Sequence, residues 1–101
     1  MAVPDLSYIA APMVSQSDAP FRMLVRQYGA TLAYSQMLDP HKLTDDRDYR
    51  EFHLRDIQAC NAYARPVVVQ LCGNDPEVIV KAARQVQTHC DGIGAYIPLR
   101  A

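Results

Sequence analysis

One polar side chain stands inside the most apolar stretch of this chain. Gln70 interrupts residues 67–71, a short run of valine and leucine that follows Pro66 and precedes Gly73. Such a run is typical of a parallel strand buried on both faces, where a carboxamide needs hydrogen-bonding partners. Ligands of parallel α/β proteins bind at the carboxyl ends of the strands. Two interpretations of Gln70 stay open: it binds a ligand, or backbone groups of the core satisfy it.

Two other segments are predicted to reach the same edge of the sheet, residues 11–14 and 35–37, because each follows a predicted parallel strand. Each segment contains a methionine, Met13 in the first and Met37 in the second. A flat conjugated ligand could rest on the backbone and on these side chains, while Gln70 hydrogen-bonds the edge of the ligand. Simple filling of the core is the alternative interpretation of both methionines.

Several other kinds of site have no motif in this sequence. The four glycines form neither a GxGxxG loop nor a P-loop, and no GxSxG elbow is present. The three cysteines, Cys60, Cys72 and Cys90, form no CxxC pair and no metal-binding pattern with the histidines. We therefore expect no metal site, and we interpret the cysteines as small buried side chains of a reduced, intracellular protein.

The charge balance provides no general attraction to nucleic acid. The net charge is -1 over 101 residues, so any RNA contact has to come from a local patch. Residues 41–61 mix acidic and basic side chains, which favours a solvated face over a nucleic-acid patch. No apolar run approaches the roughly 20 residues of a membrane span, and residues 1–8 do not resemble a signal peptide.

The first helix is predicted to begin after a cap at Ser17 or Asp18. Its apolar residues recur at spacings of three and four, which places them on one face and leaves Arg22 outside that face. This predicted apolar stripe consists of Phe21, Leu24, Val25 and Tyr28. Gly29 follows directly and fits the left-handed residue that ends many helices.

Two further segments have helical character. Residues 41–61 are predicted to be irregular and partly helical, with a cap at Thr44 or Asp45. The side chains of this segment that are expected to cover the core are Tyr49, Phe52 and Ile57. Residues 76–89 carry an apolar face at helical spacing and are predicted as a helix that begins at a cap, Asn74 or Asp75.

Strands alternate with these helices. They are predicted at residues 8–13, 31–34, 67–71 and 90–93, with a loop at 35–40, and the strand pattern fails after Ile93. Such alternation implies a parallel sheet with right-handed crossovers. The predicted fold class is α/β, either an open doubly wound sheet or a partial (β/α)8 barrel with its first three to four β/α units. A whole barrel takes roughly 250 residues.

The combination of several segments resembles a known family. APMVSQSDAPFR at 11–22, SQML at 35–38, RPVVVQLCGNDPEVIVKAA at 65–83 and CDGI at 90–93 resemble the N-terminal part of the tRNA-dihydrouridine synthases, notably the eukaryotic synthase-1 subgroup. The resemblance covers about residues 8–93, so residues 1–101 are interpreted as the N-terminal part of a flavin-binding (β/α)8 barrel. It implies bound FMN, NADPH as reductant and reduction of uridine in tRNA. By the family motif, Pro12, Met13 and Val14 line the FMN, and Gln70 hydrogen-bonds its isoalloxazine ring.

Residues 94–101 depart from the family pattern. The family continues with a motif of the form DxNxGCP, whose cysteine protonates uracil. In register, Tyr96 stands in place of the asparagine and Leu99 in place of the cysteine. A leucine has no transferable proton, and a tyrosine lacks the paired donor and acceptor of an amide. We therefore expect no catalytic residue in this chain, and no activity from it alone.

Two alternatives to an enzyme fragment stay open. One is a non-catalytic interaction fragment that associates through open strand edges, and the other is a small α/β binding domain without flavin. Open edges favour pairing with another chain. Val67, Val69 and Leu71 are expected to face the interior of the incomplete barrel, which predicts a poorly soluble, oligomeric or molten chain. The expected location is intracellular, in the cytoplasm or the nucleus.

Overall fold

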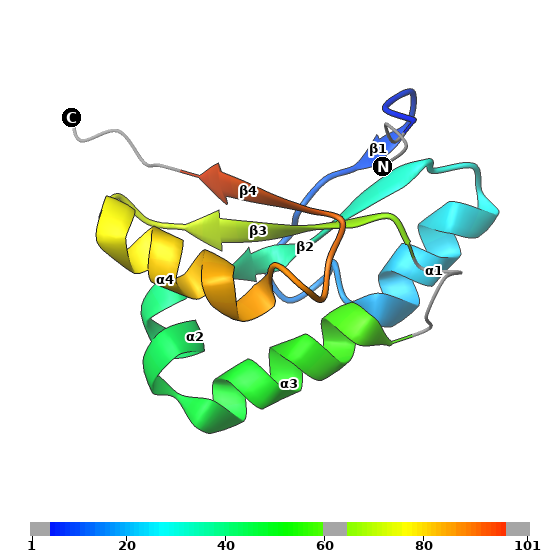
Figure 1. The fold of residues 1–101 in the computed structure, drawn as a ribbon. Coiled ribbons are helices and arrows are strands. Elements are labelled where there is room, and N and C mark those ends of the chain that lie inside the picture. The colour runs from blue at the N-terminus through cyan, green and yellow to red at the C-terminus, as the bar shows by residue number, and fades with distance from the viewer. Residues whose placement is uncertain (1–4, 60–64, 97–101) are drawn as a thin grey trace.

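The structure is a computed structural model that describes residues 5–59 and 65–96. Within these ranges one parallel sheet follows the chain order, with β1 (Ile9–Ala10), β2 (Leu32–Leu38), β3 (Val67–Cys72) and β4 (Gly92–Tyr96). The connecting helices are α1 (Ala19–Gln27), α2 (Pro40–Asp45), α3 (Arg47–Gln58) and α4 (Pro76–Val86). Figure 1 shows α2, α3 and α4 on one side of the sheet. The predicted α/β class with a parallel sheet is confirmed.

The core lies between the sheet and these helices. Val67, Val69 and Leu71 of β3 are fully buried and pack in one cluster with Ala82 and Val86 of α4. The alternate residues of β3 point to the opposite face, where they are only half-buried. The expectation that the three buried residues face an open barrel interior is therefore wrong, because the helix layer covers them.

The first two strands differ from their predicted lengths. β1 keeps only two residues of the predicted 8–13, because the chain turns after Ala11. β2 is longer than predicted and includes residues 35–38, which were expected to form a loop. Its pairing with β3 shifts register between Tyr34 and Met37. A β-bulge of this kind bends the strand without ending it.

Helix α1 begins at Asp18, whose side chain accepts a hydrogen bond from the Phe21 N–H, so one of the two predicted caps is confirmed. The predicted orientation of the helix is wrong. Tyr28, on the predicted apolar stripe, is 84% exposed, whereas Arg22 is fully buried. Gly29 follows the C-terminal cap Tyr28 with a φ of 101°, which confirms the predicted left-handed residue after the helix.

The segment predicted as partly helical contains two helices. The side chain of Asp39 caps α2, and the side chain of Asp46 caps α3, so the predicted cap at Thr44 or Asp45 is wrong. Ile57 is buried against the core as expected. Phe52, by contrast, is exposed on the outer side of α3.

The last two elements form where the pattern predicted them, with shifted ends. Asp75 caps α4, which ends at Val86 instead of residue 89. β4 covers Gly92–Tyr96 instead of residues 90–93, so three residues of the divergent tail still pair with β3. None of the helices in the described part of the chain is long and apolar enough to cross a membrane.

Candidate ligand site at the carboxyl edge of the sheet

The segment after β1 is folded back on itself by Ser17. The Ser17 hydroxyl accepts a hydrogen bond from the Met13 N–H at 2.9 Å and donates one to the Ala11 carbonyl at 2.9 Å. The Met13 carbonyl accepts two further bonds, from the N–H groups of Gln16 and Ser17. We call residues 11–17 the first loop. Because Ser17 is buried, this loop is held from its inner side.

A side chain of the second strand holds the tip of the first loop. Ser15 adopts a positive φ of 62°, which is uncommon for a residue other than glycine. Its N–H donates to the carboxamide oxygen of Gln36 at 3.1 Å. Gln36 lies in the bulged part of β2. The hydrogen bond between Ser15 and Gln36 therefore connects the first loop to the bulged part of β2.

Gln70 presents its carboxamide on the face of the sheet that the helices leave uncovered. Its backbone N–H donates to the Ser35 hydroxyl at 3.1 Å, which replaces a ladder bond at the bulge. A Cβ at Gly94 would lie 2.6 Å from the Gln70 carboxamide oxygen, so the glycine leaves room for the Gln70 side chain. Within residues 5–59 and 65–96 no hydrogen bond of the carboxamide is observed, and its role toward a ligand stays a prediction.

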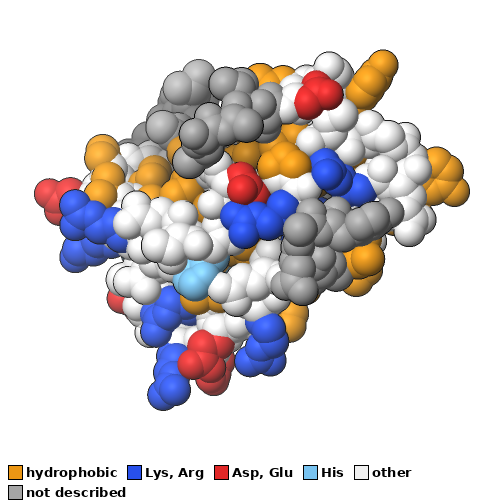
Figure 2. Space-filling view, turned by 45° about the vertical axis from the view of Figure 1, so that its right-hand side comes forward, with side chains coloured by type: hydrophobic (Ala, Val, Ile, Leu, Met, Phe, Trp, Pro, Cys, Tyr) orange, Lys and Arg blue, Asp and Glu red, His pale blue; other side chains and the backbone are white. Residues whose placement is uncertain are grey.

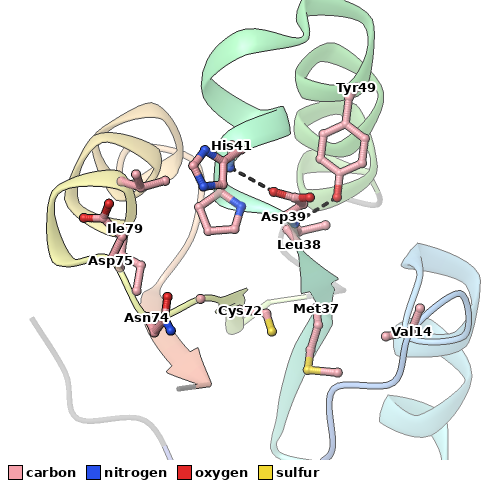
Figure 3. A pocket seen from close by; sticks show the side chains of 13 residues that line it. Val14, Met37, Leu38, Asp39, His41, Tyr49, Cys72, Asn74, Asp75 and Ile79 are labelled. Atoms are coloured by element: carbon pink, nitrogen blue, oxygen red, sulfur yellow. Dashed lines mark hydrogen bonds between the residues drawn. The ribbon is translucent and has the colours of Figure 1, made fainter. Parts of the chain in front are cut away.

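A cavity of about 460 Å³ opens at the carboxyl ends of β2 and β3, next to the first turns of α2 and α4. In Figure 3, Val14 approaches it from the first loop, while Met37 and Cys72 approach from the strand ends. His41 and Asn74 line it from the helix side. Ligand sites of α/β proteins have this position and this mixture of apolar and polar groups.

The polar groups of the cavity carry no positive charge from lysine or arginine, because neither residue is among those that line it. Asp39 and Asp75 line it, and their carboxylates cap α2 and α4 by accepting backbone N–H groups. The Tyr49 phenol oxygen accepts the Asp39 N–H at 3.0 Å, and burial raises the pKa of this phenol. The cavity therefore suits a neutral part of a ligand better than a phosphate.

The four predicted cofactor-binding residues lie at one edge of the sheet but in different settings. Val14 lines the cavity together with Met37, and Met37 is the register neighbour of Gln70 on β3. Pro12 and Met13 are half-buried within the first loop, and neither they nor Gln70 lines this cavity. The predicted meeting of the strand ends is confirmed, whereas the ligand-binding roles stay predictions.

Three residues of the site escaped prediction from the sequence. Ser17 was considered only as a helix cap, although its hydroxyl shapes the first loop. Gln36 was assigned to a loop, so its bond to Ser15 was not expected. Gly94 lies in the divergent tail, and no local signal marks its closeness to Gln70. The roles of Gln36 and Gly94 depend on contacts between segments far apart in the sequence, whereas Ser17 acts within the first loop.

The fold defines a class of protein, the α/β proteins built from successive parallel β/α units. The model of the dihydrouridine synthase (Dus) family matches residues 9–95, and the chain belongs to this family. The family folds as a (β/α)8 barrel, of which the four described strands form a part. The predicted family and the predicted partial barrel are thus confirmed.

Named relatives agree with the family assignment. The chain is 44% identical over 85 residues to the tRNA-dihydrouridine(16/17) synthase [NAD(P)(+)] of Saccharomyces cerevisiae, and these cover 84% of this chain and 20% of the relative. It is 42% identical over 87 residues to the enzyme of the same name from Schizosaccharomyces pombe, covering 84% and 21%. A tRNA-dihydrouridine(20a/20b) synthase of S. pombe is 35% identical, covering 86% and 25%. The chain thus spans about a fifth of the length of the first two relatives.

Proposed function

We propose that this chain forms the first β/α units of the flavin-binding barrel of a tRNA-dihydrouridine synthase. Such an enzyme reduces the C5–C6 bond of uridine in tRNA, inside the cell in the cytoplasm or the nucleus. The observation that carries the proposal is the Gln70 carboxamide, which lies without a hydrogen-bonding partner in the described ranges at the carboxyl edge of the sheet. Family membership over residues 9–95 supports it.

The residues of this edge fit a flat cofactor such as FMN. Gln70 offers a paired donor and acceptor to the rim of a heterocycle, and the Gly94 backbone beside it has no side chain to obstruct the approach. Pro12, Met13 and Val14 would hold one side of the ring through the first loop. When bound, FMN would supply hydride to the uracil ring, with NADPH as the reductant. The cofactor phosphate would need basic residues outside the cavity of this chain.

The family motif that would supply the proton donor of the reaction is not matched by this chain. Tyr96, at the family position of the asparagine, ends β4 beside Cys72 and is half-exposed. Leu99, at the family position of the cysteine that protonates uracil, lies outside the described residues. Figure 2 shows Lys and Arg side chains interspersed with Asp and Glu on one face. We therefore assign tRNA as the substrate of the complete barrel and assign no RNA-binding surface to this chain.

A chimera tests the proposal. Residues 9–93 of this chain replace the matching segment of the S. cerevisiae relative, so that the relative supplies everything after Ile93. We expect the purified chimera to retain flavin absorbance and to form dihydrouridine in tRNA when NADPH is added. A folded chimera that retains no flavin, when the unmodified relative retains it under the same conditions, would contradict the proposal.

A second candidate function is a non-catalytic interaction fragment. The observation that favours it is the large apolar side chains left exposed on the outer strands or directly before β1: Tyr8, Ile9, Ile93 and Tyr96. Within the described part of the chain, β1 and β4 each pair on one side only. Association without flavin binding would favour this function over the first.

A further inference from the structure

A fully buried arginine joins α1 to α3. Arg22 is 0% exposed, and its Nη1 donates to the Asp56 carboxylate at 3.1 Å while its Nη2 donates to the Asp56 carbonyl at 2.7 Å. The other carboxylate oxygen of Asp56 accepts the Ala19 N–H at the start of α1, at 2.9 Å. The two side chains thus fix the first turn of α1 against α3.

The pair is not explained by stability alone. A buried ion pair loses the hydration of both charges, and apolar side chains of similar volume often stabilise a protein as well or better. Here the cost is increased by the Arg22 Nε, which is buried and has no partner in the described ranges. Buried ionic groups with this cost are retained in some proteins because they hold one particular conformation.

The conformation that Arg22 holds is that of the first loop. Its Nη1 also donates to the Ser17 carbonyl at 3.0 Å, and Ser17 is the residue whose hydroxyl binds Met13 and Ala11. A continuous set of hydrogen bonds therefore runs from Asp56 on α3, through Arg22 and Ser17, to the backbone of the first loop.

We propose that Arg22 and Asp56 are positioning residues that fix the first loop in its ligand-binding shape. Arg22 acts through Ser17, and it does not touch the cavity. The identity of the ligand, FMN, rests on the proposed function, whereas the ordering of the loop does not.

Amide hydrogen exchange of the 101-residue chain tests the ordering directly. Arg22→Lys keeps the charge and loses the planar set of donors, and the paired variant Arg22→Met with Asp56→Asn removes both charges together. We expect the amides of Met13, Gln16 and Ser17 to exchange roughly 10- to 100-fold faster in both variants, as loss of a hydrogen bond to a charged group predicts. The exchange rates of the β3 amides should rise only by the factor that the lower urea midpoint of each variant predicts.

Two controls separate this role from a general loss of stability. Arg65 and Asp91 form an ion pair at 2.9 Å next to the amino ends of β3 and β4, away from the first loop. The matched variant Arg65→Met with Asp91→Asn should leave exchange in the first loop unchanged. Val86→Ala truncates the core and calibrates how much a lower urea midpoint alone accelerates exchange. Loop exchange in Arg22→Lys that is no faster than this calibration predicts would overturn the inference.

Flavin binding by the chimera of residues 9–93 provides a second measurement. We expect Arg22→Lys to raise the Kd of FMN by roughly 10-fold, because the loop must be ordered on binding, with the matched Arg65 and Asp91 variant unaffected. A parent chimera that binds no FMN would contradict the proposed function, and loop exchange would still decide the role of Arg22. Equal FMN affinity together with unchanged loop exchange in Arg22→Lys would overturn the positioning role.

Discussion

At the scale of single residues, the availability of Gln70 follows from the alternation of side chains along β3. Its neighbours Val69 and Leu71 point to the helix layer and are fully buried. Gln70 points the other way, toward Gly94 and the ring of Tyr34. A carboxamide in that position avoids the cost of burial among the apolar groups of the helix side.

Gln70→Ala should weaken FMN binding without unfolding the protein. In the chimera of residues 9–93, loss of one hydrogen bond to a buried partner is worth about 1–3 kcal/mol, or roughly 5- to 150-fold in Kd. Flavin fluorescence titration measures the change. Val68→Ala, on the same face of β3, removes no hydrogen-bonding group and serves as the control. An FMN affinity equal to that of the parent would refute the role of Gln70.

Gly94→Ala in the 101-residue chain should displace the Gln70 side chain at little cost in stability. The added Cβ would lie 2.6 Å from the carboxamide oxygen, which can swing away because it ends a flexible side chain. We expect the free energy of unfolding to change by less than about 1 kcal/mol, the scale of a compatible glycine-to-alanine change. The NMR signals of the Gln70 side-chain amide should shift, whereas Gly92→Ala, with no close contact to Gln70, should leave them in place.

At the scale of elements, all four described helices begin at an aspartate: Asp18, Asp39, Asp46 and Asp75. An aspartate cap satisfies a free N–H group and places negative charge at the positive end of the helix. These caps fix where the connecting segments enter the helices. Two of them, Asp39 and Asp75, also shape the cavity.

Helix α3 contains a histidine that should make stability depend on pH. The ring centroid of His53 lies 4.4 Å from that of Tyr49 and 5.1 Å from that of Phe52, and burial lowers the pKa of His53. The imidazole therefore binds a proton more readily in the unfolded chain than in the folded one. The free energy of unfolding is highest above the unfolded pKa of about 6.5, and it decreases as the pH falls toward the folded pKa. We expect a lower urea midpoint at pH 5.5 than at pH 7.5.

Two variants identify the group responsible for that pH dependence. His53→Asn should flatten the difference in urea midpoint between pH 5.5 and pH 7.5. His41→Asn, which replaces an exposed imidazole, should retain it. The assignment to His53 fails if its replacement leaves the difference as large as in the parent chain.

At the scale of the whole molecule, the sheet has one covered face and two open edges in the described ranges. The helix side of β3 is fully buried, so a folded helix–sheet core is expected to persist. Burial of apolar surface contributes roughly 25 cal/mol per Å², and net stabilities are only about 5–15 kcal/mol. Burial of the exposed apolar side chains of the outer strands would therefore strongly favour association between copies of the chain.

We predict that the isolated 101-residue chain is poorly soluble or oligomeric, with its strand edges in contact with other copies. Light scattering measures the mass, and circular dichroism follows the thermal transition. Tyr8→Lys together with Tyr96→Lys, which places charge directly before β1 and at the end of β4, should reduce the mass. A monomeric mass combined with a sharp two-state transition in the parent chain would sink this prediction.

The 101-residue chain should form no dihydrouridine when supplied with tRNA, FMN and NADPH. We predict that Leu99 stands at the family position of the proton donor, and a leucine has no transferable proton. Mass spectrometry of digested tRNA measures the product, and the chimera of residues 9–93 is the positive control. Product above that of a heat-killed sample would overturn the expectation, and Cys72 and Cys90 would then be the first residues to replace.

Local patterns in the sequence determined most of the elements and the family. The aspartates before α1 and α4, the apolar run of β3 and the glycine after α1 are signals that act within a few residues. The meeting of three strand ends followed from alternation, because parallel strands place their carboxyl ends at one edge. The family could be recognised because several of its characteristic segments occur together in this chain, and the family model matches residues 9–95.

Only the tertiary structure decided which faces are buried and which groups meet. The stripe of Leu24 and Tyr28 has the spacing of a core face, yet both side chains are exposed, because burial depends on the neighbouring elements and not on periodicity. Arg22 is buried because Asp56, 34 residues away along the chain, compensates its charge. Gly94 and Gln36 gain their roles from register across β3 and from the bulge in β2. Contacts between residues so far apart leave no local sequence pattern, so they could not be predicted from such patterns.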